Sequence, residues 1–287
     1  MLKPTIECSC NGTYLETEFS YDTPPVGETP FDIGDQTYNR SYSKCVLCGH
    51  RFSVNPMDLR ELYGGAYVDI TYGDRLKETF ERILVLPPQD SDNAGRVATV
   101  LEFSGERFGA SYVPSLVDIG SGLCVFAYRM KEAGWRCTVI DPDPRAAKHA
   151  RETVGVHAVT GDFMKLDTAE LGHFDVVTLN KVLEHVVDPL AMLARTKSLL
   201  SPRGFVYLEV PDAEAAAAEG PVREEFFVEH HHVFSIASTA MLAGRAGLRV
   251  VRIQRLREPS GKFTIRTFLD CVAQTSYNPK SMNRNTT

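Results

Sequence analysis

The sequence lacks any apolar run that approaches the roughly 18 residues needed to span a bilayer. Its first residues, Met1–Thr5, do not open a signal peptide, which would follow a charged start with an apolar stretch. Basic residues are in the minority, because 31 Lys and Arg stand against 37 Asp and Glu for a net charge of −6. A general nucleic-acid binder would normally be basic. We therefore expect a soluble, cytoplasmic protein with no membrane span and no nucleic-acid partner.

Cysteine is present in seven copies, an odd number, and no secretory signal accompanies them, so a disulfide framework is not expected. Three of the seven stand alone in apolar stretches, where a cysteine usually acts as a small buried hydrophobe: Cys124, Cys137 and Cys271. The other four form two close pairs near the N-terminus: Cys8, Cys10, Cys45 and Cys48.

These two cysteine pairs have the composition of a zinc site. Four thiolates suit tetrahedral zinc, and Gly49 lets the backbone amides after the second pair turn toward the sulfurs. Residues 1–55 read as loops and short strands that bury little core, so a metal staple is expected there. We predict a zinc-ribbon-like module with a structural zinc. Three alternatives stay open, namely reduced cysteines in a loose arm, a redox pair, and His50 replacing one cysteine ligand.

The rest of the chain changes in texture near residue 111. Residues 56–110 look helical and form a connection and cap, whereas residues 111–275 alternate strands with helices. This alternation predicts an α/β fold with a mostly parallel, doubly wound, Rossmann-like sheet. A helix over residues 189–200 is expected to stop at Pro202, and two apolar strands close the domain. Residues 276–287 are polar and are predicted to be a disordered tail.

A glycine-containing turn begins the second part of the fold. Asp118, Gly120 and Gly122 lie where a buried strand meets a helix, and glycine lets that backbone approach a ligand closely. Nineteen residues after Gly122, the next strand ends in Asp141, whose carboxylate can accept hydrogen bonds from both hydroxyls of a ribose. A nicotinamide site is disfavoured, because Val125 stands where its third glycine belongs. An incidental glycine turn in an α/β protein is the remaining alternative.

Two more strand ends complete a recognisable series. The third strand runs into Asp162 and Phe163, and the fourth into a stretch from Asn180 and Lys181 to Val186. Across roughly residues 90–273, this series resembles that of class I S-adenosylmethionine-dependent methyltransferases, whose sheet has seven strands and commonly ends in a strand pair.

The resemblance implies S-adenosylmethionine as cofactor and a role for each strand end. Gly120 and Gly122, in the loop that Asp118 begins, would flank the methionine part, and Asp141 would hold the ribose. Asp162 would bond the adenine amino group while Phe163 packs on the ring. Backbone from Asn180 and Lys181 would form the floor of the site. Where many members have a third glycine, this chain has Cys124.

A histidine cluster follows the fifth strand, in a loop that should face the cofactor. Methyl transfer often needs a base, and histidine suits that task because its ordinary pKa lies near 6.5. We take His230 as the candidate base with Glu229 as its partner, and His185 as the competing base. Other possibilities are a solvated turn, substrate contacts from Asp212 or Glu209, and a second metal site made by Glu229, His231 and His232.

Together with the cysteine pairs, the Glu229–Ser235 segment resembles the sugar C-methyltransferases of deoxysugar biosynthesis. That resemblance places Phe227 at a tyrosine position, Glu229 at the glutamate and His230 at the catalytic histidine of an aromatic-x-Glu-His motif. It implies a sugar or nucleotide-sugar acceptor. Phe227 lacks the hydroxyl, so other acceptors stay open, including O-methylation of a phosphate-like or other small molecule. A non-catalytic adenosyl-binding protein that docks a partner through its zinc module is the rival from another class.

Overall fold

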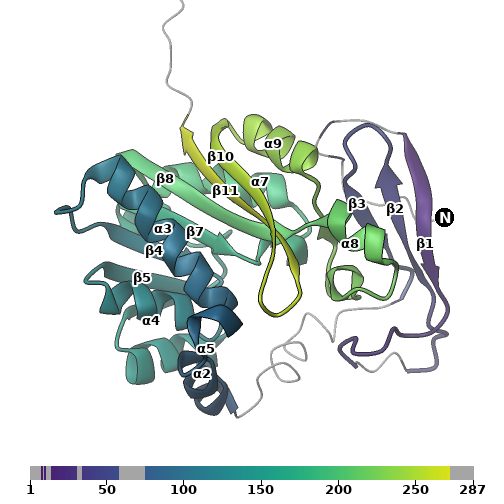
Figure 1. The fold of residues 1–287 in the computed structure, drawn as a ribbon, viewed down its shortest axis with the longest axis horizontal. Helices are drawn as coiled ribbons and strands as arrows, with labels where there is room; N and C mark the ends of the chain where they lie inside the picture. The colour runs from purple at the N-terminus through teal and green to yellow at the C-terminus, as the bar shows by residue number, and fades with distance from the viewer. Residues whose placement is uncertain (1–7, 9, 11–13, 31–33, 58–74, 272–287) are drawn as a thin grey trace, which may run out of the picture.

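The computed structural model describes residues 8, 10, 14–30, 34–57 and 75–271 and contains two β-sheets side by side (Figure 1). The predicted tail at 276–287 and part of the predicted helical connection lie outside these residues. Within the described ranges, no helix is both long and apolar enough to cross a membrane.

The larger sheet has seven strands in the order β10-β11-β8-β7-β4-β5-β6. Strands β8, β7, β4, β5 and β6 run parallel, whereas β11 is antiparallel to both β8 and β10. The predicted doubly wound sheet with a closing strand pair is therefore confirmed. Its strands are β4 (Ser115–Ile119), β5 (Arg136–Asp141), β6 (His157–Thr160), β7 (Phe174–Asn180), β8 (Leu200–Pro211), β10 (Leu248–Arg257) and β11 (Phe263–Cys271).

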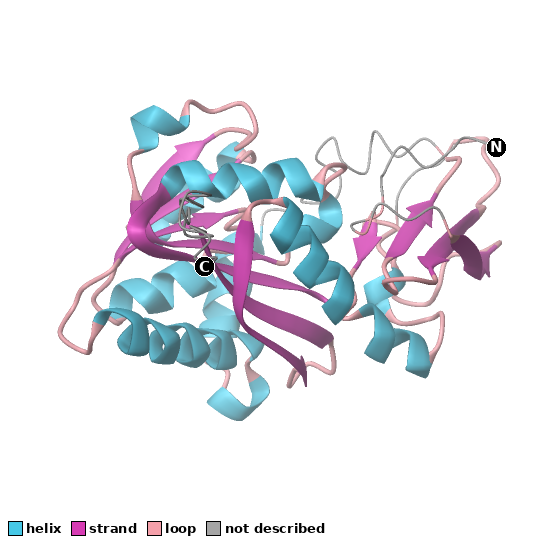
Figure 2. Cartoon of the chain, turned by 90° about the horizontal axis from the view of Figure 1, so that it is seen from above, coloured by secondary structure: helices cyan, strands magenta, loops and turns pink. Residues whose placement is uncertain are grey.

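Helices cover both faces of this sheet (Figure 2). The helices of the described residues are α2 (Leu76–Leu84), α3 (Asp92–Phe108), α4 (Val125–Glu132), α5 (Pro144–His149), α6 (Thr168–Leu171), α7 (Pro189–Arg195), α8 (Ala213–Glu219) and α9 (Ile236–Arg245), with short 3₁₀ or π turns between some of them. Helix α3 begins at a capping serine, Ser91, whose hydroxyl accepts the amide of Ala94 at 3.2 Å.

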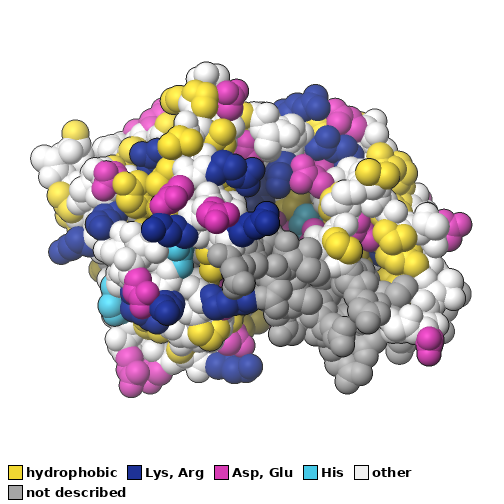
Figure 3. Space-filling view, turned by 90° about the horizontal axis from the view of Figure 1, so that it is seen from below, with side chains coloured by type: hydrophobic (Ala, Val, Ile, Leu, Met, Phe, Trp, Pro, Cys, Tyr) yellow, Lys and Arg dark blue, Asp and Glu magenta, His cyan; other side chains and the backbone are white. Residues whose placement is uncertain are grey.

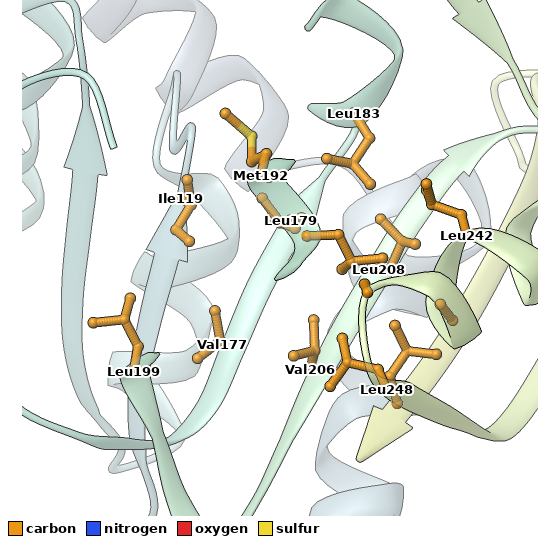
Figure 4. Packing of buried hydrophobic residues seen from close by; sticks show 14 of the residues in the cluster. Ile119, Val177, Leu179, Leu183, Met192, Leu199, Val206, Leu208, Leu242 and Leu248 are labelled. Atoms are coloured by element: carbon orange, nitrogen blue, oxygen red, sulfur yellow. The ribbon is translucent and has the colours of Figure 1, made fainter. Parts of the chain in front are cut away.

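Neighbouring residues of one strand pack on opposite faces of the sheet, because successive side chains of a strand point to opposite sides. Val177 of β7 belongs to the same buried apolar cluster as Leu193 of α7 and Leu242 of α9. Figure 4 shows part of this cluster, with Val177 and Leu242 labelled. The neighbouring Val176 joins Phe103 of α3 in the cluster on the other face. This double burial explains why β7 reads as a nearly continuous apolar run.

One predicted boundary is wrong. Helix α7 ends at Arg195, a 3₁₀ turn follows, and Pro202 lies inside β8 instead of ending a helix. The pairing of β8 with β7 shifts register between Phe174 and Val176. Pro202 lies within this irregular stretch, where the regular ladder hydrogen bonds are interrupted and the lack of an N–H on proline is tolerated.

The smaller sheet is antiparallel and has the order β1-β2-β3-β9, with strands β1 (Leu15–Tyr21), β2 (Arg40–Cys45), β3 (Arg51–Val54) and β9 (His232–Val233). Its fourth strand thus comes from the histidine cluster, far along the chain. Tyr42 of β2 packs with Phe226 and with Ala216 of α8 in a separate apolar cluster. The N-terminal residues and the segment that follows β8 therefore share one core.

Candidate active site

A cavity of about 1010 Å³ lies at the carboxyl ends of the parallel strands of the larger sheet. The turn that follows β4 and the ends of β5 and β7 line one part of it, and residues 224–230 line another. Basic side chains gather around a hollow on this face of the molecule (Figure 3), and those that line the cavity are Arg96, Lys165, Lys181 and Lys262. Acidic residues also line the cavity, and Lys165 pairs with Asp162 and Lys262 with Glu224, so the lining carries charges of both signs.

The turn after β4 needs its glycines. Gly120 has φ of +73°, and a Cβ built there would lie 2.8 Å from Cγ2 of Val182. Gly122 has φ of +50° and donates its N–H to Oδ2 of Asp141 at 2.9 Å. Cys124 also has a positive φ, of 63°, where it precedes α4. The Gly122 bond therefore holds the turn against the end of β5, and at Gly120 a side chain would collide with Val182.

Asp141 is held by backbone amides at the cavity wall. Besides the Gly122 bond, its Oδ1 accepts the N–H of Asp143 at 2.9 Å. The carboxylate is 6% exposed, and burial raises its pKa above the usual value. A ligand hydroxyl would give this buried carboxylate further hydrogen bonds.

Asp118 lies one layer deeper and positions Asn180. Its Oδ1 accepts the hydroxyl of Thr178 at 2.6 Å and the side-chain amide of Asn180 at 2.8 Å. Burial raises the pKa of Asp118 to about 6. The side-chain oxygen of Asn180 has no hydrogen-bond partner in the described part of the chain, although it is buried beside the cavity. That oxygen is a ready acceptor for a ligand.

The other predicted cofactor residues also line the cavity. Asp162 accepts the amide of Met164 at 2.9 Å and pairs with Lys165 at 3.1 Å. Phe163 is 3% exposed, with the guanidinium of Arg195 5.5 Å from its ring centre. Lys181 has φ of 58°, and its buried Nζ donates to Oγ1 of Thr264 at 2.8 Å.

His185 and His230 line the far part of the cavity and lie edge to face, with ring centres 4.8 Å apart. Nδ1 of His185 donates to the carbonyl of Glu229 at 3.0 Å, and Nδ1 of His230 donates to the carbonyl of Glu225 at 2.9 Å. A carbonyl can only accept, so both neutral rings carry their proton on Nδ1. Burial lowers the pKa of His185 to about 4 and that of His230 well below its usual value. Both rings are therefore neutral at physiological pH.

Glu184 lies beside this pair. It is 1% exposed, and burial raises its pKa to about 7. One ligand atom from each of Glu184, His185 and His230 lies within 4.8 Å of the other two. Oε2 of Glu184 is buried with no hydrogen-bond partner among the residues that the structure describes. The cluster thus combines two neutral imidazoles with one incompletely bonded carboxyl group.

Glu229 contributes to the histidine pair mainly through its backbone. Its carbonyl holds His185, while its carboxylate lies 3.5 Å from the hydroxyl of Thr29. Burial raises the pKa of Glu229 to about 7. The group that orients His230 at Nδ1 is accordingly the Glu225 carbonyl, whereas Glu229 stands next to it in the cavity wall.

The remaining histidines of the cluster take other directions. Nδ1 of His232 lies 2.9 Å from Nε2 of His50, inside the smaller sheet, and His230 alone of the three lines the cavity. The grouping of Glu229 with His231 and His232 is not among the described sets with metal-ligand spacing. Each of the three neighbouring histidines therefore occupies its own environment.

Asp212 and Glu209, considered as substrate contacts, are buried structural groups outside the cavity lining. Asp212 caps α8 and pairs with Arg255. Glu209 pairs with Arg96 and Arg266, whose charges outweigh its burial and lower its pKa to about 2.

The smaller sheet fixes the backbone of His230. The hydroxyl of Tyr42 donates to the carbonyl of His230 at 2.7 Å. One residue on, His231 donates its N–H to the carbonyl of Glu184 at 2.7 Å and accepts the N–H of Ser53 at 3.0 Å. This segment is therefore held between the two sheets.

The four N-terminal cysteines converge. Their sulfurs lie within 4.8 Å of one another, with Sγ of Cys8 3.3 Å from those of Cys10 and Cys48. Zinc bonds of about 2.3 Å place tetrahedral sulfurs roughly 3.8 Å apart, so the set can hold zinc. His50 does not join this cysteine set, because its two ring nitrogens lie beside Ser238 and His232.

Sequence reasoning missed three contributors to the far part of the cavity: Glu184, Glu225 and Tyr42. Glu184 was visible as the neighbour of His185, but no spacing indicates that it meets His230. The Glu225 carbonyl and the Tyr42 hydroxyl act on backbone or ring positions that carry no motif. Their roles became visible only in the fold.

Comparison with known proteins assigns the family. A family profile described as a methyltransferase domain matches residues 75–253, more than half of the chain. The chain therefore belongs to the methyltransferase domain family. The prediction of a class I S-adenosylmethionine-dependent methyltransferase is confirmed at the level of family and fold, and the family supports S-adenosylmethionine as the methyl donor.

Two curated relatives match part of the chain. It is 33% identical to the ubiquinone biosynthesis O-methyltransferase of Actinobacillus pleuropneumoniae over 116 residues, which are 37% of this chain and 50% of the relative. It is 32% identical to the protein of that name from Xanthomonas campestris over 157 residues, which are 51% of this chain and 64% of the relative. The chain thus spans between half and two thirds of the length of these relatives.

Among the solved structures that the chain resembles is a methyltransferase that matches most of its length. The 1,6-didemethyltoxoflavin-N1-methyltransferase of Burkholderia thailandensis, with bound 1,6-didemethyltoxoflavin and S-adenosylhomocysteine, matches with a TM-score of 0.55 at 19% identity. The match covers 85% of this chain and 99% of the other. At that identity the likeness shows the fold, and the predicted Rossmann-like methyltransferase fold is confirmed. The narrower prediction of a sugar C-methyltransferase stays a prediction.

Proposed function

We propose that the protein transfers a methyl group from S-adenosylmethionine to a small polar acceptor. The observation that carries this proposal is that the Gly120 turn and the His185–His230 pair line one continuous cavity. The first is suited to an adenosyl ligand and the second to an acceptor. The non-catalytic alternative is disfavoured, because a binding protein has no need of two neutral imidazoles beside its ligand.

The donor would lie along the ends of the parallel strands. Asp141, fixed by two backbone amides, would accept the ribose hydroxyls, and the Asn180 side-chain oxygen would accept from the methionine end. Asp162 and Phe163 would contact the adenine. These roles are proposals that rest on the cavity lining and on the sequence resemblance.

The chain's own chemistry concerns the acceptor proton. When bound, S-adenosylmethionine would supply a methyl group carried by a sulfonium, with the C–S bonding pair staying on sulfur and the acceptor's lone pair forming the new bond. Nε2 of His230 or of His185 would take the proton that the acceptor loses, because Nδ1 of each ring is committed to a carbonyl. The cavity walls would hold the acceptor and align it.

The lowered pKa values of the two histidines bear on the acceptor class. Neutral rings can accept a proton, but a base with a conjugate acid near pKa 4 removes protons poorly from an ordinary alcohol. An acidic acceptor, such as a phenol or a carbon next to a carbonyl, fits better. The names of the curated relatives favour an oxygen acceptor, whereas the Glu229–His230 motif favours a carbohydrate-derived carbon.

Donor binding tests the proposal most directly. Titration calorimetry with S-adenosylmethionine should show binding by the native protein, and Asp141→Ala should lose about 1–3 kcal/mol. Incubation with radiolabelled donor and separate panels of phenolic and nucleotide-sugar acceptors should label one panel. Absence of donor binding would overturn the proposal, and unchanged affinity in Asp141→Ala would assign the ribose to another residue.

We also propose one structural zinc at Cys8, Cys10, Cys45 and Cys48. The set is clamped to α9, because Arg245 donates to the carbonyl of Cys8 at 2.9 Å and Ser235 donates to the carbonyl of Cys48. Elemental analysis should find zinc in the purified protein, and Cys45→Ser should release it and lower the melting temperature. Metal-free protein with four freely titratable thiols would contradict this assignment.

A further inference from the structure

We propose that Glu184, His185 and His230 form a binding site for a divalent transition-metal ion, distinct from the cysteine set. The site lies at the acceptor end of the cavity. Ion binding is a property of these three side chains alone, whereas the role of the ion in catalysis rests on the proposed function.

The ligand types and their spacing support the site. Two imidazoles and one carboxylate, with further positions open, are a recurring donor set for iron(II), manganese(II) and zinc. The three ligand atoms already lie within 4.8 Å of one another. Metal bonds of about 2.0–2.2 Å need ligand atoms about 3–4 Å apart, which small side-chain rotations can provide.

Both histidines present the atom that a metal requires. Metal-bound histidines usually donate their other ring N–H to a carbonyl or carboxylate, which fixes the tautomer and the ring orientation. Here Nδ1 of His185 and of His230 each donate to a backbone carbonyl, at 3.0 Å and 2.9 Å. The lone pair is consequently on Nε2 in both rings. The outer contacts of a metal site are therefore already built.

The carboxyl group of Glu184 lacks a partner that a metal would supply. Its Oε2 is buried without a hydrogen-bond partner in the described structure. A buried carboxylate oxygen in that state is costly unless a cation or a donor satisfies it. A divalent ion between Glu184 and the two imidazoles would satisfy it.

Backbone contacts hold the ligands together although they come from two distant segments. His231 donates its N–H to the carbonyl of Glu184 at 2.7 Å, so the residue after one ligand is bonded to another. The His185 bond to the Glu229 carbonyl adds a second tie between the same segments. Such mutual support is what a preorganised site requires.

The ion would help the acceptor to lose its proton, a task that the two histidines alone perform poorly. An acceptor oxygen bound to a divalent ion loses its proton more readily, as zinc-bound water does. With both Nε2 atoms on the ion, that proton would pass to solvent water instead of to a histidine. Open coordination positions facing the cavity suit an acceptor with two neighbouring oxygens, which can chelate the ion. The acceptor class that fits is therefore a vicinal dihydroxy compound or an adjacent hydroxyl and carbonyl.

Manganese distinguishes this site from the cysteines, because thiolates select softer ions. Chelator-treated protein should be titrated with Mn²⁺ alone and followed by the loss of the six-line electron paramagnetic resonance signal of the free ion. One Mn²⁺ should bind per chain, and Glu184→Gln and His185→Ala should each weaken binding at least tenfold. His231→Asn is the matched control, because it changes a neighbouring histidine outside the set and should bind as the native protein does.

Each result supports the inference or overturns it. Native protein that binds no Mn²⁺, or Glu184→Gln that binds it normally, would overturn the site. A cooperative circular dichroism melt would show that the Glu184→Gln variant is folded and that its binding measurement is valid. If the variant does not fold, Glu184→Asp is measured in its place, and we expect the same tenfold loss. Calorimetry with S-adenosylmethionine on the same samples separates the two proposals, because the donor end should bind in every variant. Native protein that does not bind S-adenosylmethionine would instead count against the proposed function.

Discussion

The two ends of the cavity are built by different means. At the donor end, Gly120 and Gly122 follow one parallel strand and Asp141 ends the next, so backbone amides do most of the positioning. At the histidine end, side chains from separate loops meet, and a second sheet holds them through contacts such as the Tyr42 hydroxyl.

This difference separates the part of the cavity that follows from the sheet topology from the part that depends on one particular loop. Parallel strands place their carboxyl ends at one edge by geometry alone, so the donor end follows from the sheet. The histidine end depends on the seating of residues 224–234 against β3 and α8. The four predictions below test whether the two ends respond independently.

Removing the ring of His230 should have the largest effect. We expect His230→Ala to bind S-adenosylmethionine normally yet to lose about 10²–10⁴ in rate, the usual contribution of a positioned base or ligand. Initial rates and calorimetry on one sample measure both. His231→Ala should be milder. An inactive His185→Ala beside a fully active His230→Ala would transfer the role to the loop after β7.

Gly120→Ala should damage the donor end instead. A methyl group there combines a positive φ with contact to Val182, so we expect a loss of about 1–3 kcal/mol in unfolding free energy together with weakened donor binding. Gly172→Ala is the matched control, because Gly172 has φ of +77° but open space around its Cβ position. It should lose stability and keep donor affinity. Equal donor affinity in both variants would remove the close-approach argument.

Asp118→Asn should stabilise the protein in a pH-dependent manner. The pKa of Asp118 is about 6 in the fold against an ordinary 3.8, so the folded state holds the extra proton and loses stability as pH rises through this window. Asparagine keeps an acceptor for Thr178 and Asn180 without the charge. We expect a gain of roughly 1–2 kcal/mol at pH 8 that vanishes below about pH 4.

Chemical unfolding at several pH values checks this expectation. Asp175→Asn is the opposite control, because hydrogen bonds from Ser115, Ser201 and Tyr112 outweigh burial and lower the pKa of Asp175. Its loss of stability should be largest at neutral pH and shrink in acid. An Asp118→Asn variant that is less stable at pH 8 would show that the charge itself is needed.

Tyr42→Phe should have the smallest effect, confined to the histidine end. Loss of the hydroxyl leaves the His230 carbonyl without a buried donor, which costs about 1 kcal/mol. We expect a several-fold lower rate with unchanged donor affinity. Tyr112→Phe removes a hydroxyl bonded to Asp175 on the opposite side of the domain and should leave the rate unchanged. Equal rates in both variants would show that the second sheet does not set the position of His230.

The same contrast explains how far the sequence could be interpreted. The turn at Gly120 and the acid at Asp141 lie on neighbouring strands, so local patterns predicted the sheet and the donor end together. The meeting of Glu184 with His230 depends on a two-residue strand, β9, whose pairing no periodicity encodes. Pro202 likewise led to a wrong helix boundary, because a register shift in the pairing of β8 lets a strand contain this proline.

Strand β9 has a further consequence, for the order of events during synthesis. His50 and His232, which contact each other in the finished sheet, are 182 residues apart in the chain. While the ribosome is translating the intervening residues, β3 presents an open edge, and the large parallel sheet can form before that edge is covered. The N-terminal strands should therefore reach protease resistance late, after the residues around β9 have left the exit tunnel. Closing so distant a pair is slow relative to local folding, so the histidine end should mature after the Gly120 and Asp141 end of the cavity.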